Sequence, residues 1–252
     1  MRRSVMPTQH WSGSAQLSAG FGVFRGEIGD SALHAHYAHQ LVIALEGEVG
    51  VAFPTGPLRA AGIAIPAGLP HCVCAERALL IYLDPLSPEG AALFRPAATA
   101  AQQLEAGLCT QLLTAAGEGQ PLRGVLSNVL GVSRPPAPDA RMAAVADALR
   151  AGVAGGAVSR LQLAELANLS PSRFSHWFVE QAGLPLRSYR KWLRLEMALH
   201  RLALGGNLTE AAHSAGFADS AHLSRTFREM FGMNPAALLR GIALDSSFVQ
   251  AA

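Results

Sequence analysis

Three histidines fall within six residues near the start of the chain, in the stretch LHAHYAHQLVIALEGEVGVAF from Leu33 to Phe53. Imidazole nitrogens bind transition metals, and they also form hydrogen bonds with organic ligands. These residue types therefore predict either the metal site of an oxidative enzyme or a pocket that senses a ligand. On a strand, His34, His36 and Gln40 would point to the same side, because side chains alternate with a period of two.

The three cysteines and a further histidine complete the set of candidate ligands. Cys72 and Cys74 follow the histidine segment and could serve as soft metal ligands. His39 would point away from His34 and His36, so we expect it at the surface or rim. Cys109 lies in a helical stretch and is expected to be buried. An odd cysteine count, with two of the three separated by one residue, does not fit a disulfide framework and favours a reducing cytoplasm.

The elements around these residues are short apolar stretches separated by Gly and Pro, such as LVIALEGEVGVAF, GIAIPAGLPHCV and ALLIYLD. This pattern predicts a small β-barrel or sandwich over residues 1–85. Residues 86–132 show helical spacing, as in AAQQLEAGLCTQLLTAA, and predict two helices. Their apolar stripe could form a homodimer interface or pack on the chain's own barrel, and the sequence leaves both open.

Composition limits the class of protein. The chain has 252 residues, enough for two small domains, and no apolar run reaches the ~20 residues of a membrane span. Arg2 and Arg3 are followed by Pro7 and Gln9 instead of an apolar signal core, so we expect a cytoplasmic protein without a membrane partner. The net charge of +2 divides into −1 up to Arg134 and +3 after it. This weak basic excess permits nucleic-acid binding without indicating it.

The stretch SRPPAPD has three prolines in four positions and predicts an extended linker over residues 133–138. The following domain, residues 139–252, is predicted to be helical throughout. Ser159 and Gln162 have the spacing of a capping box that opens a helix at about residues 160–168. Ser170 can cap the next helix, with Pro171 at its first position. Two short helices with so tight a turn predict a helix-turn-helix.

The pattern then occurs a second time. Asn207 and Glu210 have the spacing of a second capping box, the helix stops at Gly216, and Asp219 caps the helix SAHLSRTFREMFG. Between the two units, PLRSYRKWLRLEMALHRLAL predicts a helix of about 18 residues, ~27 Å long. Two recognition helices held by such a helix could enter successive major grooves, ~34 Å apart, on one face of DNA.

These residues resemble the DNA-binding domain of AraC/XylS transcriptional regulators. The resemblance covers roughly 80 residues, and its most specific part is AAHSAGFADSAHLSRTFREMFGMNPAALLR. It implies that one set of side chains contacts DNA and a second set faces the core. The DNA-contacting set is Ser172, Arg173, Ser175, His176, Ser220, Ala221, His222 and Arg225. The core-facing set is Phe174, Trp177, Phe178, Leu223, Phe227 and Phe231.

Individual members of the DNA-contacting set have different chemistry. Arg173 and Arg225 could each bond guanine O6 and N7 together, and His176 could reach bases or phosphates. Ala221 departs from the larger polar residues often found at its position and offers at most a contact with a thymine methyl group. Four basic residues on the connecting helix could meet phosphates or form a solvated face: Arg187, Arg190, Lys191 and Arg194.

The first half resembles the cupin barrel that family members often carry as a sensor. His34-Ala35-His36, Gln40, Gly47 and the turn from Pro66 to His71 follow the cupin signature, which implies that His71 approaches the other histidines from a neighbouring strand. Gln40 stands where an enzymatic cupin has Glu. A neutral amide is a poor replacement for the anionic ligand of a catalytic Fe²⁺ site, but three histidines can still hold Zn²⁺, Ni²⁺ or Cu²⁺. The alternative is that the turn and the inward histidines belong to the scaffold and line a pocket that binds an organic effector by hydrogen bonds.

The sequence thus predicts an α+β protein with a cupin-like barrel, intermediate helices and an all-α double helix-turn-helix domain. Its expected function is that of a sequence-specific, non-enzymatic transcription factor that senses a small effector or a metal ion. Its partners would be double-stranded DNA and, for an activator, RNA polymerase. One alternative is a cupin dioxygenase or isomerase with an accessory helical domain. Another is a DNA-binding protein whose barrel only dimerises.

Overall fold

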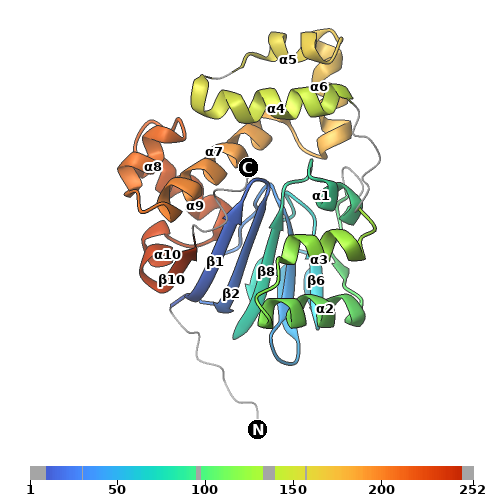
Figure 1. Ribbon diagram of the computed structural model, residues 1–252, viewed down its shortest axis with the longest axis vertical. Helices are drawn as coiled ribbons and strands as arrows, with labels where there is room; N and C mark the ends of the chain where they lie inside the picture. Colours follow the sequence, from blue (N-terminus) through green and yellow to red (C-terminus); the bar gives the residue numbers. More distant parts are fainter. Residues whose placement is uncertain (1–9, 30, 95–97, 133–139, 157, 246–252) are drawn as a thin grey trace.

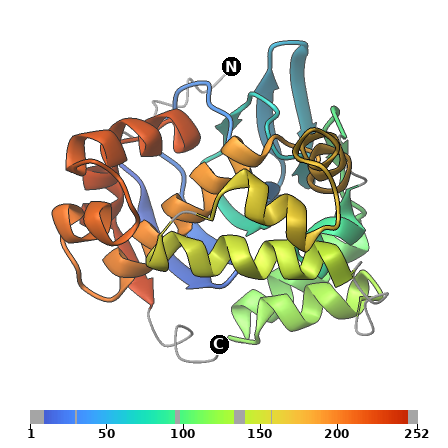
Figure 2. The same ribbon diagram turned by 90° about the horizontal axis from the view of Figure 1, so that it is seen from above.

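The computed structural model describes residues 10–29, 31–94, 98–132, 140–156 and 158–245. Strands form the centre of the molecule, and helices of the C-terminal half surround one end and one side of them (Figures 1 and 2). The predicted α+β class is confirmed. The Pro-rich linker predicted at 133–138 lies outside the described residues. No helix in the described part of the chain is both long and apolar enough to span a membrane.

The strands form two sheets. The larger sheet has the strand order β10-β1-β2-β8-β3-β6-β9. Its strands are β1 (Ser12–Ser18), β2 (Phe21–Glu27), β3 (His39–Ala44), β6 (Gly62–Ile65), β8 (Arg77–Leu83), β9 (Gln102–Gln103) and β10 (Ile242–Asp245). The smaller sheet has the order β5-β4-β7 and consists of β4 (Val49–Phe53), β5 (Gly56–Ala60) and β7 (Cys72–Cys74).

Of the two expected arrangements, a barrel and a sandwich, the described strands form two sheets and not a closed barrel. The β4–β5 hairpin pairs with β7 instead of with a strand of the larger sheet, so within the described residues no ladder joins the two sheets. Both faces of the larger sheet are buried. Val42 and Leu80 face the smaller sheet and the C-terminal helices, whereas Leu41 and Leu79 face the opposite side. The strands therefore alternate between two apolar layers, as their period of two requires.

The helices that follow β8 cover the second of these faces. They are α1 (Pro88–Leu93), α2 (Ala106–Gly117) and α3 (Leu122–Val129), so this segment holds three helices and a short strand instead of two helices. Leu112, Leu122 and Leu126 pack against Leu41 and Leu79 of the sheet. The apolar stripe of these helices is therefore buried on the chain's own sheet. Cys109 is buried in the same layer, as predicted.

The C-terminal half contains two helix-turn-helix units. The first comprises α5 (Arg160–Leu166) and α6 (Pro171–Ala182) after α4 (Ala140–Gly155), and the second comprises α8 (Leu208–Ser214) and α9 (Ser220–Phe231). The connecting helix α7 (Leu186–Ala203) has 18 residues, as predicted, and α10 (Pro235–Gly241) follows the second unit.

The predicted caps explain where these helices begin. Ser159 and Gln162 form both bonds of the capping box, and the Ser170 and Asp219 side chains cap α6 and α9. Asn207 accepts from the N–H groups of Thr209 and Glu210, but Glu210 bonds the Asn207 side chain instead of its backbone, so the second box is incomplete.

The second unit is joined to the larger sheet. Strand β10 lies beside β1 in a parallel pairing, with Gly13 opposite Ile242 and Gln16 opposite Asp245. Phe227 of α9 and Trp192 of α7 belong to the same apolar core as Phe24 and Val42 of the sheet. The C-terminal half thus supplies both an edge strand and part of the cover for the inner face of the sheet (Figure 1).

Candidate functional site

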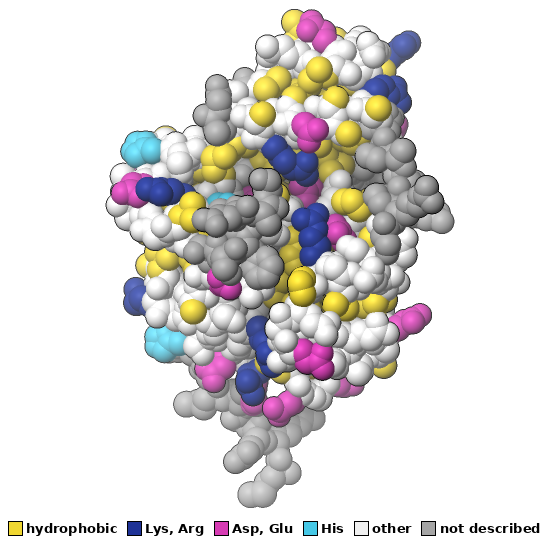
Figure 3. All heavy atoms as spheres, viewed as in Figure 1, with side chains coloured by type: hydrophobic (Ala, Val, Ile, Leu, Met, Phe, Trp, Pro, Cys, Tyr) yellow, Lys and Arg dark blue, Asp and Glu magenta, His cyan; other side chains and the backbone are white. Residues whose placement is uncertain are grey.

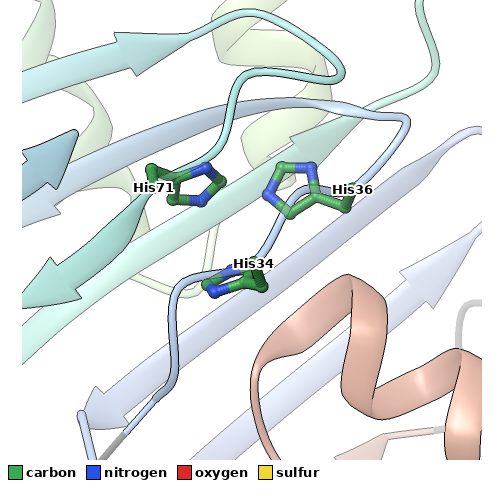
Figure 4. Close-up of side chains that lie close together, drawn as sticks. All are labelled: His34, His36 and His71. Atoms are coloured by element: carbon green, nitrogen blue, oxygen red, sulfur yellow. The ribbon is translucent and has the colours of Figure 1, made fainter. Parts of the chain in front are cut away.

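His34, His36 and His71 lie together at the end of the sheet, with their rings turned toward one another (Figure 4). One ligand nitrogen from each ring lies within 4.8 Å of the other two, and all three side chains are buried. His34 and His36 belong to the loop before β3 instead of to a strand. His34 pairs with His71 through two backbone hydrogen bonds of 3.0 and 2.8 Å, and this isolated bridge aligns the two rings.

The backbone sets the tautomer of each ring. The Nδ1 atoms of His34, His36 and His71 lie 2.8, 2.9 and 2.8 Å from the carbonyl oxygens of Ala32, Ala38 and Leu69. A carbonyl oxygen only accepts, so we assign the ring hydrogen to Nδ1 in all three cases. Each Nε2 then carries a lone pair, as in a histidine that ligates a metal while its other nitrogen bonds a backbone carbonyl.

Burial keeps these rings neutral. Burial is the main cause that lowers the pKa of His36 well below 6.5, and the neighbouring His71 and His34 lower it further. Burial likewise lowers the pKa of His71 to about 4 and lowers the pKa of His34. Within the described residues the Nε2 atom of His71 is buried without a hydrogen-bond partner. A metal ion or a ligand donor would satisfy this atom.

Gln40 closes the cluster on one side. Its amide oxygen lies 3.1 Å from His36 Nε2, and its amide nitrogen lies 3.0 Å from the Tyr82 hydroxyl oxygen. Because His36 Nε2 is an acceptor, it needs a donor, and the favourable arrangement exchanges the amide oxygen and nitrogen of Gln40. The amide nitrogen then donates to His36 Nε2, and the Tyr82 hydroxyl donates to the amide oxygen. Gln40 therefore serves as a hydrogen-bond partner of the cluster, which agrees with the expectation that it replaces the carboxylate of an enzymatic centre.

The three histidines fit a divalent metal ion. The donor set is three neutral imidazoles, which suits Zn²⁺, Ni²⁺ or Cu²⁺. A tetrahedral Zn²⁺ with bonds of ~2.1 Å would hold two nitrogens about 3.4 Å apart, so binding must draw the nitrogens closer together than 4.8 Å. The cysteines are outside this set, since Cys72 donates to the Ser31 carbonyl and the Cys74 side chain is exposed. Iron would lack the anionic ligand of a catalytic site.

His39 is placed differently from the expectation. It does point away from the cluster, but it is buried instead of lying at the surface. Its ring contacts the ring of Phe94 with centroids 4.9 Å apart, and its Nδ1 accepts from the Ala67 N–H. Burial lowers the pKa of His39 to about 4. The reason is tertiary, because Phe94, at the end of α1, covers a strand position that the sequence alone leaves open.

A cavity of about 90 Å³ adjoins the histidines, between the larger sheet and the C-terminal helices. Trp11, Phe24 and Tyr82 line it from the sheet side, while Trp192, Phe227 and Phe231 line it from α7 and α9. The wall is mainly apolar, and its polar side chains are Ser18, Ser31, His34, Gln40, Tyr82 and Glu196. No Lys or Arg is among the described residues that line it. This composition suits a small, mostly apolar ligand.

Among the described residues of this lining, Glu196 is the one with an acidic side chain, and it belongs to a buried group between the two halves. One of its oxygens accepts from the Gly20 N–H at 2.6 Å. Burial is the main cause that raises the pKa of Glu196 to about 7, and Asp84 raises it further. Asp84 itself accepts from the Tyr189 hydroxyl at 2.8 Å and from Arg150 at 3.1 Å. These bonds connect the end of β8 to α4 and α7 of the helical half.

The side chains expected to contact DNA lie on α6 and α9. Arg173, His176 and Arg225 are exposed, and so is Ala221. Ser175 is partly buried, and its hydroxyl donates to the Pro171 carbonyl of its own helix. The remaining members are an exposed Ser172 and the half-buried Ser220 and His222, the last of which packs edge-on against the Phe217 ring. On the face shown in Figure 3, basic side chains are scattered among acidic and apolar ones.

The opposite sides of these helices form the cores of the two units. Phe174 and Phe178 are fully buried in the first unit, and Leu223 and Phe227 in the second. Trp177 is half-buried against Phe174. On α7, Lys191 bonds Glu229 at 2.8 Å, and Arg190 donates to the Val158 carbonyl. Part of the basic face of α7 is thus occupied by contacts within the chain.

Phe231 lines the cavity, a position that the sequence did not reveal. It was expected in the core of the second unit, but its ring reaches the cavity. Its centroid lies 5.7 Å from that of Tyr82 and 6.2 Å from that of His36. Trp192 lies 6.4 Å from His36 and shares this position. Helical periodicity marks both residues as apolar, but it contains no information about which partner they meet.

Residues 163–241 match the family model described as a helix-turn-helix domain. This match covers most of the first unit, the connecting helix and the whole second unit, the region where the AraC/XylS motifs occur. This segment of the chain is therefore a helix-turn-helix domain of the AraC type. The resemblance recognised in the sequence is thereby confirmed.

Part of the chain is similar to the transcriptional activator RhrA of Rhizobium meliloti (strain 1021). The two are 29% identical over 120 residues, which is 46% of this chain and 38% of RhrA. The match therefore spans well under half the length of that relative.

Solved structures of ToxT from Vibrio cholerae have the fold of this chain over most of its length. ToxT of strain O395 aligns with a TM-score of 0.61 at 11% identity, covering 88% of this chain and 98% of ToxT. ToxT of strain SCE256 with a bound unsaturated fatty acid aligns with a TM-score of 0.57 at 9% identity, covering 94% and 98%. At these identities the likeness concerns the fold alone.

Proposed function

We propose that the protein is a sequence-specific DNA-binding regulator of transcription whose N-terminal half binds an effector. The observation that carries the proposal is the pair of capped helix-turn-helix units joined by the 18-residue helix α7, within the segment that matches the helix-turn-helix family. A helix of this length spans ~27 Å, which suits two helices that enter successive major grooves. Regulation of transcription also places the protein in the cytoplasm.

The DNA-contacting residues are proposed on the two recognition helices. The exposed guanidinium groups of Arg173 and Arg225 suit bidentate contacts with guanine, and the exposed imidazole of His176 suits a base or a phosphate. The small side chains of the set let the backbones of α6 and α9 approach the DNA closely: Ser172, Ser175, Ser220 and Ala221. His222, whose ring packs on Phe217, completes the set. RhrA is described as an activator; activation by this chain, through contact with RNA polymerase, is part of the proposal.

The cavity beside the histidines is the proposed effector site. It is enclosed by residues of both halves, so a ligand there would contact the sheet and the DNA-binding domain together. Such a ligand can shift the protein between two arrangements only if it binds them unequally, and contacts with both halves provide that difference. ToxT structures contain a fatty acid and a naphthalenyl butenoic acid. The described lining of this cavity contains Glu196 and no Lys or Arg, so it does not favour a carboxylate ligand.

The proposal gives the histidines a binding role instead of a catalytic one. Gln40 supplies a neutral amide at the position where a metal-dependent oxygenase needs an anionic ligand, and it is already bonded to His36 and Tyr82. The comparisons also place the helical half in a family of DNA-binding proteins and leave the cupin enzyme alternative without support.

Selection of bound sequences from a random DNA pool, followed by fluorescence anisotropy on the selected site, tests this function. Arg225→Ala should weaken binding to the selected site by about 1–3 kcal/mol and relax the preference at one base pair. Arg240→Ala, a change at an exposed arginine of α10, is the matched control and should have little effect. Affinity should also fall steeply with added salt, because phosphate contacts release counterions.

Equal binding to all sequences, or a complex that is insensitive to salt, would contradict the proposed function.

A further inference from the structure

The end of α9 lies directly against the histidine loop. The Ala32 N–H donates to the Gly232 carbonyl at 3.1 Å, and Ala32 in turn accepts from His34 Nδ1. Gly232 is the left-handed cap of α9, with φ of 68°. A Cβ atom at this position would lie 2.5 Å from the Ala32 oxygen and 2.9 Å from His34 Nδ1. Close packing of backbone on backbone therefore connects one candidate ligand to the second helix-turn-helix unit.

The same unit covers the histidines from another direction. Phe231, next to this cap, and Trp192 on α7 place their rings near His36. The two rings also contact each other, with centroids 6.4 Å apart. In Figure 4 a helix of the C-terminal half passes beside the three rings. The cluster is thus enclosed by the sheet on one side and by the second unit on the other.

We propose that His34, His36 and His71 bind a divalent transition-metal ion and that this ion holds the second helix-turn-helix unit against the sheet. The inference rests on the proposed function, for which it names the ligand class and the element that responds. One nitrogen from each of the three rings lies within 4.8 Å of the other two, and among the described residues the buried Nε2 atom of His71 has no hydrogen-bond partner. Zn²⁺ suits three imidazoles and a fourth ligand from water or Gln40.

The coupling follows from the geometry of binding. A tetrahedral ion holds three nitrogens about 3.4 Å from one another, so binding ties the loop that carries His34 and His36 to His71 at separations shorter than 4.8 Å. Because the Gly232 backbone packs on Ala32 and His34, the metal-bound loop and the docked cap stabilise each other. Linkage makes this reciprocal, so docking of the second unit must raise metal affinity by the factor by which the metal favours docking.

Competition with a chromophoric chelator, on the full chain at pH 7, measures the metal site itself. We expect one Zn²⁺ per chain, and Co²⁺ should give the visible absorption of a four-coordinate site. His71→Ala should weaken Zn²⁺ binding at least a hundredfold, and His36→Gln provides a second ligand variant if the first folds poorly. His213→Ala, an exposed histidine on α8, is the control and should bind as the parent does. Unchanged affinity in both ligand variants would overturn the site.

Two glycines in equivalent positions test the coupling. Gly232 and Gly183 are the left-handed caps of α9 and α6, with φ of 68° and 72°, so alanine strains the backbone equally at either. Gly232→Ala should weaken Zn²⁺ binding about tenfold because the new methyl group displaces the cap from His34. Gly183→Ala should leave Zn²⁺ affinity unchanged. Equal effects of the two substitutions would overturn the coupling.

Hydrogen exchange gives a readout that metal affinity alone does not. Zn²⁺ should slow exchange in the segment from α9 to β10, residues 220–245, more than in α5 and α6 of the first unit. Equal protection of both units would contradict the proposal. DNA affinity is measured on the same preparations without metal. Selective DNA binding by a protein that takes up no Zn²⁺ would reject this inference while leaving the proposed function intact.

Discussion

The two helix-turn-helix units are built by the same local rules but have different surroundings. Each recognition helix begins at a side-chain cap, Ser170 or Asp219, and ends at a glycine with a left-handed backbone, Gly183 or Gly232. The first unit forms a core with α4 and α7. The second shares its core with the sheet and adds β10 to the edge of that sheet. The second unit is therefore the part that a ligand near the histidines can influence directly.

The difference also concerns the chemistry of attachment. The first half is connected to α4 and α7 through polar bonds of the buried Asp84 with Arg150 and Tyr189. The second unit is attached through apolar rings, backbone pairing and the contact of Gly232 with Ala32. The strength of the polar bonds depends on the charges of their partners. The strength of the apolar contacts depends on how well the cavity between them is filled.

The largest effect is expected from truncating the equivalent phenylalanines of α6 and α9. Phe178→Ala and Phe227→Ala each remove a buried ring and should lower the free energy of unfolding by about 3–5 kcal/mol. Only Phe227 lines the cavity, so Phe227→Ala should also enlarge it and change the emission of Trp192. Urea unfolding and tryptophan fluorescence measure the two effects. A loss of Trp192 packing in both variants would remove the proposed distinction between the units.

The next largest effect concerns Asp84. Asp84→Ala leaves Arg150 and Tyr189 without their acceptor and should cost about 2–4 kcal/mol in urea unfolding, less than a fully buried ion pair because Glu196 is relieved of a neighbouring acid. The control is Asp147→Ala, since Asp147 is exposed and lies 3.8 Å from the same arginine. A similar cost for the two substitutions would show that the buried bonds contribute little.

Glu196 should make stability depend on pH. Burial is the main cause that raises its pKa from 4.5 to about 7 in the folded chain, so its protonated form stabilises the fold below pH 4.5. This stabilisation is lost as the pH rises through 7. Glu196→Gln should therefore stabilise the protein by about 1–3 kcal/mol at pH 8, with little effect at pH 5. The charged groups that face it are Asp84, Arg150 and Arg123.

Urea unfolding of both proteins at pH 5, 6, 7 and 8 measures the difference. A constant difference across this range would show that Glu196 titrates as an ordinary exposed carboxyl group.

The smallest effect is expected at the helix caps. Ser170→Ala and Asp219→Ala each remove a side chain that accepts from the first turn, and each should cost about 1 kcal/mol in thermal unfolding. Asp219→Ala should in addition lower Zn²⁺ affinity slightly if α9 is coupled to the histidines. Ser170→Ala should leave Zn²⁺ affinity unchanged. A larger loss of Zn²⁺ affinity in Ser170→Ala than in Asp219→Ala would contradict the difference between the two units.

Local patterns were sufficient to predict several features. The capping residues, the length of α7, the repeat of the two units and the proximity of His34, His36 and His71 all depend on spacing within short segments or on the family motif. Spacing did not decide two features of the strands. It left a barrel and a sandwich both open, where the structure has two sheets, and it predicted an exposed His39, which is buried under Phe94. Both depend on which strand or helix lies beside a segment, and spacing does not encode neighbours.

The sequence by itself determined the helices, their ends and the residue types at the histidine cluster, because caps, periodicity and side-chain chemistry act over a few residues. Only the tertiary structure decided that β10 pairs with β1, that Phe231 faces His36, and that the Gly232 cap lies on the loop that holds His34. The physical reason is the distance along the chain between the residues that interact. These contacts join segments about 200 residues apart, and they form only because the sheet and the second unit share one apolar core.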